Sequence, residues 1–488
     1  MDRKELKKAF EKSAEKWDAS AVFAYFDPEG TDVFKAGYAD RKGKRKLKKS
    51  DTVIIPLESR FFTCLALVKL IEEGRLSLNR KLSDYIPECV HADKITVRDI
   101  LRGESGLPDY FYGGIILSLQ DDEEFKTLSD KEKVKKEAKL SYNRHELSEV
   151  LDIVNGKDLN YIPGSVHNSS SQTDWFFARC IAEKLTGKTL LDYLNEILFT
   201  PIGMKPSVGN AASTVPTLCP NDDKFVPTDN EGAEYECITI GINDAIKLAQ
   251  ALVSKDERVL SAGTWDKAFA TSYSKSLLTW RSNGTHEVYM GISGYSLDIF
   301  FEPEISTGWL IMTPEEPVYK EISGRWEYYF TAVQDHIYSA ITYPVSPVFS
   351  RVNSDTVFDA MDIKINEDQT YFVDSARDSI AWTAADPVRL KPMVLTEHGR
   401  AVALAVLKVD RQKKNYAVEI IQVDKLYQHR GYGKILMREV MKYLKAQGAE
   451  KLTIGVARNN EVAIKLYKSV GFTEKEVYRG GYNLEMTL

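Results

Sequence analysis

The chain has 488 residues, which exceeds the size of one ordinary hydrophobic core, so two or three domains are expected. Its hydrophobic content of 43% and charged content of 28% are those of a soluble globular protein. The formal net charge of −6 provides no basic surface, which argues against nucleic acid as a partner.

The N-terminal residues and the cysteines indicate the cellular compartment in which the protein is expected. Residues 1–20 have a charged amphipathic helix pattern and lack the apolar stretch of a secretory signal. No run approaches the roughly eighteen apolar residues of a membrane span. The five cysteines are scattered and show no Cys-x-x-Cys, which disfavours disulfides and zinc. We therefore expect a cytoplasmic protein with no membrane contact and no metal.

The first part of the chain has strands at both ends and helices between them. Residues 19–43 predict two strands around a Pro-Glu-Gly turn. A long helical section follows over about 59–253. Strand patterns return at 287–313 as a hairpin turning near Glu302, and 324–341 predicts an amphipathic helix. This order predicts one sheet assembled from distant segments.

A break follows at TYPVSPVFS, where two prolines end the preceding helix. We expect domains at 1–343 and 351–488, joined by a linker at 344–350. For the second domain the patterns predict short helices at 354–364 and 374–384, strands at 392–397, 401–409, 416–423, 451–456 and 481–486, and helices at 433–447 and 461–470.

Several stretches of the first domain resemble class C-type β-lactamases and penicillin-binding-like serine hydrolases. They include FTCLALVKLIEEGRLSLNRKLSDYIPE, ITVRDILRGESGLPDYF and YIPGSVHNSSSQTDWFFARCIAEKLTGKTLLDYLNEILFTPIGMK, in the order and spacing of that family. The resemblance covers about 1–343. It implies an α+β fold, with an antiparallel sheet beside a helical domain.

The motifs that carry this family's chemistry are replaced. Aligned on Phe62-Thr63, the serine of Ser-x-x-Lys falls on Leu57 and the lysine on Arg60. Leucine cannot attack an acyl carbon, and arginine stays protonated near neutral pH. Tyr-x-Asn falls on Ser170, Ser171 and Gln172, and Lys/His-x-Gly falls on Tyr289–Gly291. We therefore expect a pseudoenzyme domain that binds a ligand or serves as a scaffold.

A relocated nucleophile is the alternative. Ser59 would have Phe62 at the lysine position, so no base shares its helix face. Formal Ser-x-x-Lys matches begin at Ser13 and Ser272, but neither lies in the expected context. The competing hypothesis of a serine hydrolase or esterase rests on such a serine.

The second domain contains a loop suited to an anion. A strand ending at Val423 is followed by QHRGYGK and then directly by an amphipathic helix. Small residues allow close approach of backbone N–H groups, and a helix N-terminus adds free donors and a favourable dipole. Further on, Asn460 is a good helix N-cap, Tyr467 lies two turns later, and SVGF ends that helix.

These residues resemble the GNAT acetyltransferase superfamily, whose Gln/Arg-x-x-Gly-x-Gly/Ala motif falls on Gln428–Gly433. The resemblance implies a mixed central sheet flanked by helices, and acetyl-CoA as the cosubstrate. It also implies that Asn460 contacts the cosubstrate, that Tyr467 protonates the departing thiolate, and that Ile421 and Val423 pair with the pantetheine arm. The pyrophosphate would be held at the loop by Gln428 and by the backbone of His429, Arg430, Gly431, Tyr432, Gly433 and Lys434.

The acceptor must be a neutral amine when it attacks, so a base is required. Glu419 is the nearest carboxylate on the preceding strand and, by period two, shares a face with Ile421 and Val423. A solvent-facing charge is the alternative for this residue. Residues 365–386 resemble the first helices of bacterial spermine/spermidine acetyltransferases, which implies a polyamine or another small primary amine as acceptor. A homodimer and a non-catalytic sensor of CoA are further alternatives.

Overall fold

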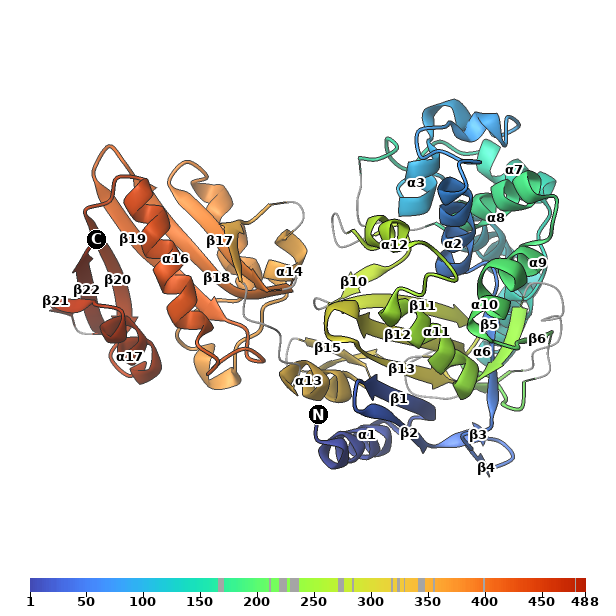
Figure 1. The fold of residues 1–488 in the computed structure, drawn as a ribbon, viewed down its shortest axis with the longest axis horizontal. Coiled ribbons are helices and arrows are strands. Elements are labelled where there is room, and N and C mark those ends of the chain that lie inside the picture. The colour runs from blue at the N-terminus through green and yellow to red at the C-terminus, as the bar shows by residue number, and fades with distance from the viewer. Residues whose placement is uncertain are drawn as a thin grey trace. The chain divides into compact units, whose positions relative to one another are not determined.

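The computed structural model describes residues 1–165, 171–209, 212–218, 226–228, 237–270, 276–282, 285–316, 319–322, 325–328, 330–340, 347–353, 356–397, 400–478 and 480–488. The chain forms two compact units, Met1–Ile337 and Tyr338–Leu488, with the division inside helix α13 (Thr331–Ala340) (Figure 1). Of the expected linker, 344–346 lies outside the described residues. Residues 348–350 instead belong to strand β16 (Val348–Arg351), because their backbone pairs with a neighbouring strand.

The first unit is built on a six-stranded antiparallel sheet of order β10-β11-β12-β13-β1-β2. The N-terminal strand β1 pairs with β13, with Phe23 opposite Ile311, so distant segments share one sheet as the sequence predicted. Phe10 of helix α1 (Arg3–Trp17) stacks on Phe330 with ring centroids 5.3 Å apart, which packs both ends of this unit together. The strands are β1 (Ala21–Asp27), β2 (Gly30–Ala36), β10 (Trp280–Ser282), β11 (Thr285–Ile292), β12 (Tyr295–Glu302) and β13 (Thr307–Thr313).

Two expectations for this sheet were wrong. The predicted hairpin at 287–313 is three strands, because Ser293 and Gly294 both adopt positive φ (41° and 89°) and form an additional tight turn. The predicted helix at 324–341 begins only at Thr331. The residues before it form strand β15 (Arg325–Tyr328), which pairs with β14 (Tyr319–Ile322).

A helical layer accompanies the sheet. Helix α2 (Arg60–Glu72) is buried on nearly every face, packs against α8 (Gln172–Thr186) and begins at the N-cap Ser59. The remaining helices are α3 (Val97–Arg102), α4 (Leu117–Asp121), α5 (Glu123–Thr127), α6 (Asp130–Ser141), α7 (Leu147–Asn155), α9 (Leu190–Leu194), α10 (Thr200–Ile202), α11 (Ile242–Ser254) and α12 (Ala262–Phe269). Short strands complete the unit: β3 (Tyr38–Asp40), β4 (Arg45–Lys46), β5 (Thr52–Pro56), β6 (Ser207–Val208), β7 (Thr217–Leu218), β8 (Val226–Pro227) and β9 (Cys237–Gly241).

The second unit is a seven-stranded sheet of order β16-β17-β18-β19-β20-β22-β21, in which only β19 and β20 are parallel. Its strands include β17 (Leu390–Glu397), β18 (Arg400–Asp410), β19 (Asn415–Val423), β20 (Lys451–Ala457), β21 (Thr473–Tyr478) and β22 (Gly481–Thr487), and its helices are α14 (Val357–Met361), α15 (Ala376–Trp382), α16 (Tyr432–Ala446) and α17 (Glu461–Ser469). Helix α16 runs along β18 and β19 (Figure 1). It buries Leu436, Met437, Val440 and Leu444 against the sheet, as an amphipathic helix should. Ala360 of α14 and Ile380 of α15 pack against side chains on the opposite face of β18.

Candidate functional site

The parallel strands of the second unit diverge and leave a cavity. β19 and β20 pair only at Ala417–Thr453 and Val418–Ile454, and the strands are unpaired with each other beyond these residues. A cavity of about 590 Å³ opens between their carboxyl ends. Ligands commonly bind outside the carboxyl ends of such strands. Ile421 and Val423 of β19 line this cavity, which leaves their strand edge available to an extended ligand.

The loop from β19 to α16 provides backbone donors at one end of this cavity. His429 and Gly431 both adopt positive φ, 60° and 89°, and alternation with right-handed residues forms a concave nest of N–H groups. A non-glycine residue held in this region is strained, and such strain concentrates at binding sites. Gly431 is the N-cap of α16 and has no side chain to cap the helix, so the N–H groups of Tyr432 and Gly433 have no partner among the described residues and can meet an anion, whereas the Lys434 N–H donates to the Gly431 carbonyl at 3.0 Å.

Two residues of α17 lie on the other side of the cavity. Asn460 caps the helix, with its Oδ1 accepting from the Ala463 N–H at 3.1 Å, and its Nδ2 is left for a further contact. Tyr467 lines the cavity and is only 4% exposed. Burial raises the pKa of the Tyr467 hydroxyl well above its ordinary value, so this group stays protonated at neutral pH.

The first unit holds a second cavity, of about 670 Å³. It is lined by Ser59, Arg60, Gln172, Tyr289 and Gly291, which come from the start of α2, the start of α8 and strand β11. The fold thus brings together positions more than 200 residues apart in the sequence. Leu57 and Ser170 are the remaining predicted positions. Leu57 is 2% exposed and packs in the core, and Ser170 lies outside the described residues.

Comparisons with known proteins match each unit separately. Residues 7–217 match the family model for β-lactamase, and 359–472 match that for the acetyltransferase (GNAT) family. The chain thus joins a domain with a β-lactamase/penicillin-binding-protein-like fold to a domain with the GNAT fold. Both parts of the fold prediction are therefore confirmed.

The relatives cover parts of the chain. An N-acetylmuramyl-L-alanine amidase of Bacillus subtilis is 30% identical over 158 residues, which is 31% of each protein. A [ribosomal protein bS18]-alanine N-acetyltransferase of Escherichia coli is 33% identical over 88 residues, which is 18% of this chain and 58% of the relative. The chain thus spans less than two thirds of the length of these curated relatives. A penicillin-binding protein from Bacillus halodurans has the same fold as the first unit, with a TM-score of 0.52 at 18% identity over 68% of this chain and all of that one.

In the GNAT domain, the polar residues of the loop have different surroundings. Gln428 lines the cavity, but its Nε2 donates to Gln369 Oε1 (2.7 Å) and to the Val423 carbonyl (3.0 Å). Asn366 donates from Nδ2 to Gln428 Oε1 at 3.1 Å. The Gln428 side chain therefore ties the loop to the 3₁₀ turn at Glu367–Gln369, an arrangement that the sequence motif did not reveal.

The side chains of the two large residues of the loop contact Tyr427. The guanidinium of Arg430 lies 5.4 Å from the centre of the Tyr427 ring, and Arg430 does not line the cavity. Tyr432 is 5% exposed, and its ring packs against Tyr427 at 5.6 Å. Their backbone N–H groups are thus the parts that can serve a ligand. His429, Tyr432, Gly433 and Lys434 line the cavity together with Gly431.

Glu419 lines the cavity but does not follow strict alternation. The pairing of β18 with β19 shifts between Val406 and Leu407, so Glu419 is the extra residue of a β-bulge. The bulge interrupts the period of two on which the shared face of Glu419, Ile421 and Val423 was expected, and Val418 and Ile421 both pack in the core under α16. All three residues of the expected face nevertheless line the cavity. The Glu419 carboxylate is 3.9 Å from Lys408 Nζ, and its side chain is 31% exposed.

In the β-lactamase-like domain, Ser59 has no base bonded to it among the described residues. Ser59 Oγ is the N-cap acceptor of the Phe62 N–H at 3.5 Å, and no lysine or histidine bonds to it within the described chain. Ser13 is 4% exposed on α1 and does not line the cavity. Ser272 and its partner Lys275 lie outside the described residues.

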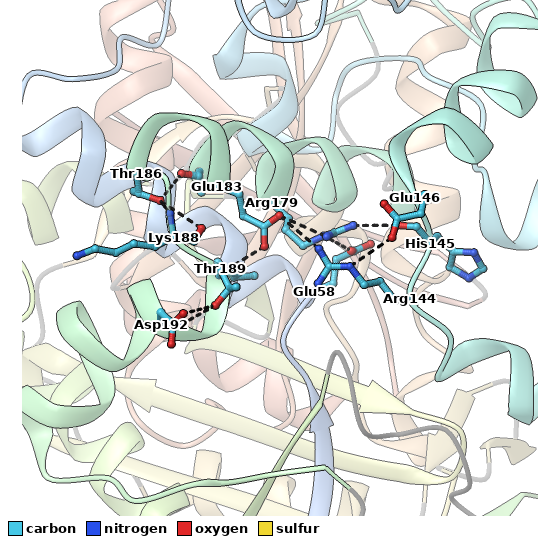
Figure 2. A network of polar contacts seen from close by, with 12 residues as sticks. Glu58, Arg144, His145, Glu146, Arg179, Glu183, Thr186, Lys188, Thr189 and Asp192 are labelled. Atoms are coloured by element: carbon cyan, nitrogen blue, oxygen red, sulfur yellow. Dashed lines mark hydrogen bonds and ion pairs between the residues drawn. The ribbon is translucent and has the colours of Figure 1, made fainter.

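Figure 2 shows a polar network around Arg179, which includes Glu58 and His145, two residues that line the cavity. Arg179 of α8 donates from Nε to Glu58 Oε2 at 2.8 Å, and from Nη2 to the backbone carbonyl of His145 at 3.2 Å. Glu183 lies one turn further along α8, 3.5 Å from Arg179 Nη1. Tyr110 donates to the other oxygen of Glu58 at 3.2 Å. The Glu58 carboxylate is therefore held and neutralised at the edge of the cavity.

Within the described ranges, no helix is both long and apolar enough to cross a membrane. In the same part of the chain, no three His, Cys, Asp or Glu side chains are grouped so that they could hold a metal ion.

Proposed function

We propose that the protein is an acetyl-CoA-dependent N-acetyltransferase that acts on a small primary amine. The observation that carries this proposal is the convergence at one cavity of three features: the gap between β19 and β20, the N–H nest at His429–Gly431, and Tyr467. The nest suits a diphosphate, and a β-carbon on Gly431 would meet no atom within 4 Å, so space exists beside it for the anion.

The chemistry follows from the cavity residues. An alkylamine is mostly protonated near neutral pH, so Glu419, or a water it holds, takes the proton as the nitrogen attacks the thioester carbon. The carbon–sulfur bond then breaks, and Tyr467 donates its proton to the departing thiolate. The raised pKa of the Tyr467 hydroxyl supports this role, since it keeps the proton in place until it is needed.

Two kinds of amine are candidates for the acceptor. A polyamine needs acidic neighbours, but two acids of the segment 365–386 are engaged elsewhere: Asp378 accepts from the hydroxyl of Ser375, the N-cap of α15, and Asp386 pairs with Arg389. The similarity to an alanine N-acetyltransferase favours the α-amine of a peptide as the second candidate.

The test is thiol release from acetyl-CoA by the full chain, with spermidine in one series and an alanine-initiated peptide in the other. We expect turnover with at least one of the two amines, and the ratio of kcat/KM assigns the acceptor class. Binding of CoA without turnover on either amine would contradict the proposal and favour a sensor.

We further propose that the β-lactamase domain does not hydrolyse its ligand. Leucine at the nucleophile position and a protonated arginine at the base position support this. A fluorophosphonate probe should therefore label no serine of the intact protein, whereas labelling of Ser59 would establish the relocated hydrolase.

A further inference from the structure

Arg60 is a buried cation that has no anionic partner among the residues that the structure describes. It is 7% exposed, and its Nη2 donates to the Ser276 carbonyl at 2.6 Å. Its Nε and Nη1 are buried and have no hydrogen-bond partner among the described residues. The rings of Trp175 and Trp280 lie 5.7 and 5.0 Å from the guanidinium carbon. Aromatic faces stabilise a cation but do not neutralise its charge.

Two neighbouring acids, Glu58 and Glu104, are each paired with another cation. Glu58 is bound by Arg179 and Tyr110, as described above. Glu104, the carboxylate that acts on Arg60 at longer range, is paired with Arg102 at 3.0 Å. The positive charge of Arg60 is therefore left over after these pairs are counted.

An uncompensated buried charge is unfavourable, because the interior cannot replace its hydration. Burial lowers the pKa of Arg60, yet a guanidinium remains protonated throughout the physiological range. A folded protein retains such a charge where another interaction offsets the free energy of its desolvation. Arg60 lines the 670 Å³ cavity, so a bound anion is the natural source of compensation.

A second buried polar atom points to a ligand in the same cavity. His145 is 8% exposed and lines the cavity, and its Nδ1 contacts Glu149 Oε2 at 3.1 Å. Its Nε2 is buried and has no partner in the described chain. Buried polar groups in native proteins are normally bonded, so this atom indicates a missing partner.

The composition of the wall restricts the class of ligand. Arg60 is the one Lys or Arg among the described residues that line the cavity, while Glu137 and Glu316 also line it. One cation beside further carboxylates suits a single negative charge and disfavours a dianion such as phosphate. Tyr112 and Tyr289 line the cavity and are 63% and 46% exposed, which suits stacking on a flat apolar group.

We propose that this cavity binds a small carboxylic acid with a flat apolar body, and that Arg60 is its counter-charge. The inference rests on the proposal that this domain does not hydrolyse its ligand, but it does not depend on acetyl transfer.

The experiment is calorimetric titration of the full chain with phenylacetate and with phenylacetamide, its neutral isostere, in the absence of acetyl-CoA. We expect the acid to bind about tenfold or more tightly than the amide, since charge-assisted hydrogen bonds contribute more than neutral ones. Arg60→Met should remove this preference. Lys69→Met is the matched control, because Lys69 is a cation of the same helix that lies outside the cavity. It should keep the preference.

Circular dichroism shows whether Arg60→Met folds. If it does not fold, the comparison of acid and amide binding by the wild type still tests the proposal. Equal binding of acid and amide by the wild type, or no binding of the acid, overturns the proposal. Retention of the preference by folded Arg60→Met also overturns it. Phenylacetate has no bond for this domain to hydrolyse, any hydrolysis of the phenylacetamide amide bond would be detected as ammonia release, and no acetyl donor is present. Failure here is therefore distinct from failure of the proposed acetyl transfer, and the fluorophosphonate test reports on hydrolysis separately.

Discussion

Tyr467 combines burial, a cavity position and a protonated hydroxyl, so a single-atom change tests its role. We expect Tyr467→Phe to lower kcat for acetyl transfer by about a hundredfold, the usual contribution of a general acid. The KM for acetyl-CoA should change little, because the ring keeps its packing against Phe472. Tyr443→Phe, on α16 outside the cavity, is the control. If both variants keep the wild-type kcat at all pH values, Tyr467 is not the acid.

At the residue scale, short motifs predicted more than isolated residues did. The motif spacing correctly placed Gln428–Gly433 before the start of α16, and Asn460 and Tyr467 on α17. This was possible because a helix start and a helix face depend on residues that are close in the sequence. The surroundings of Glu419 could not be predicted, since a bulge depends on the register with β18. The lack of a carboxylate partner for Arg60 among the described residues could not be predicted either, because its neighbours, such as Trp175 and Trp280, come from distant segments.

At the scale of the element, α16 has a left-handed glycine at each end. Gly431 precedes the helix with φ 89°, and Gly448 follows it with φ 90°. An alanine at either position costs about 1 kcal/mol in backbone strain. Only Gly431 lines the cavity, whereas a β-carbon on Gly448 would lie 3.7 Å from the Tyr416 hydroxyl.

We therefore expect Gly431→Ala to raise the KM for acetyl-CoA by about tenfold, because its methyl group occupies space needed by the diphosphate. Gly448→Ala should lose similar stability and leave this KM unchanged. Thermal melts and steady-state kinetics on both variants separate the two effects. Equal KM values for the two variants would show that the nest does not hold the cosubstrate.

The periodicity and exposure of each element explain which parts of the fold the sequence predicted. Helices and core strands such as α16 and β18 have strong periodicity and were predicted within about two residues. Strands β16 and β21 were missed, since edge strands are short and mostly exposed and so lack an apolar pattern. The Ser293-Gly294 turn was missed because its backbone conformation, and not its composition, divides the strands.

At the scale of the whole molecule, each unit has its own core and its own cavity. The large cluster of the first unit runs from Val22 to Met312, and the clusters of the second lie between Ala360 and Leu484. Each cavity is lined by described residues of one unit only. Variants in one cavity should therefore leave the chemistry of the other intact.

This independence gives a reciprocal prediction. Arg60→Met should keep kcat/KM for acetyl transfer within about twofold of wild type, and Tyr467→Phe should keep the affinity for phenylacetate, since additivity holds for sites that share no partners. Adding phenylacetate to the acetyl-transfer assay should also leave the rate unchanged. An altered rate in the wild type but not in Arg60→Met would instead demonstrate a coupling free energy between the two sites, and the β-lactamase domain would then be a ligand-responsive regulator of the GNAT domain.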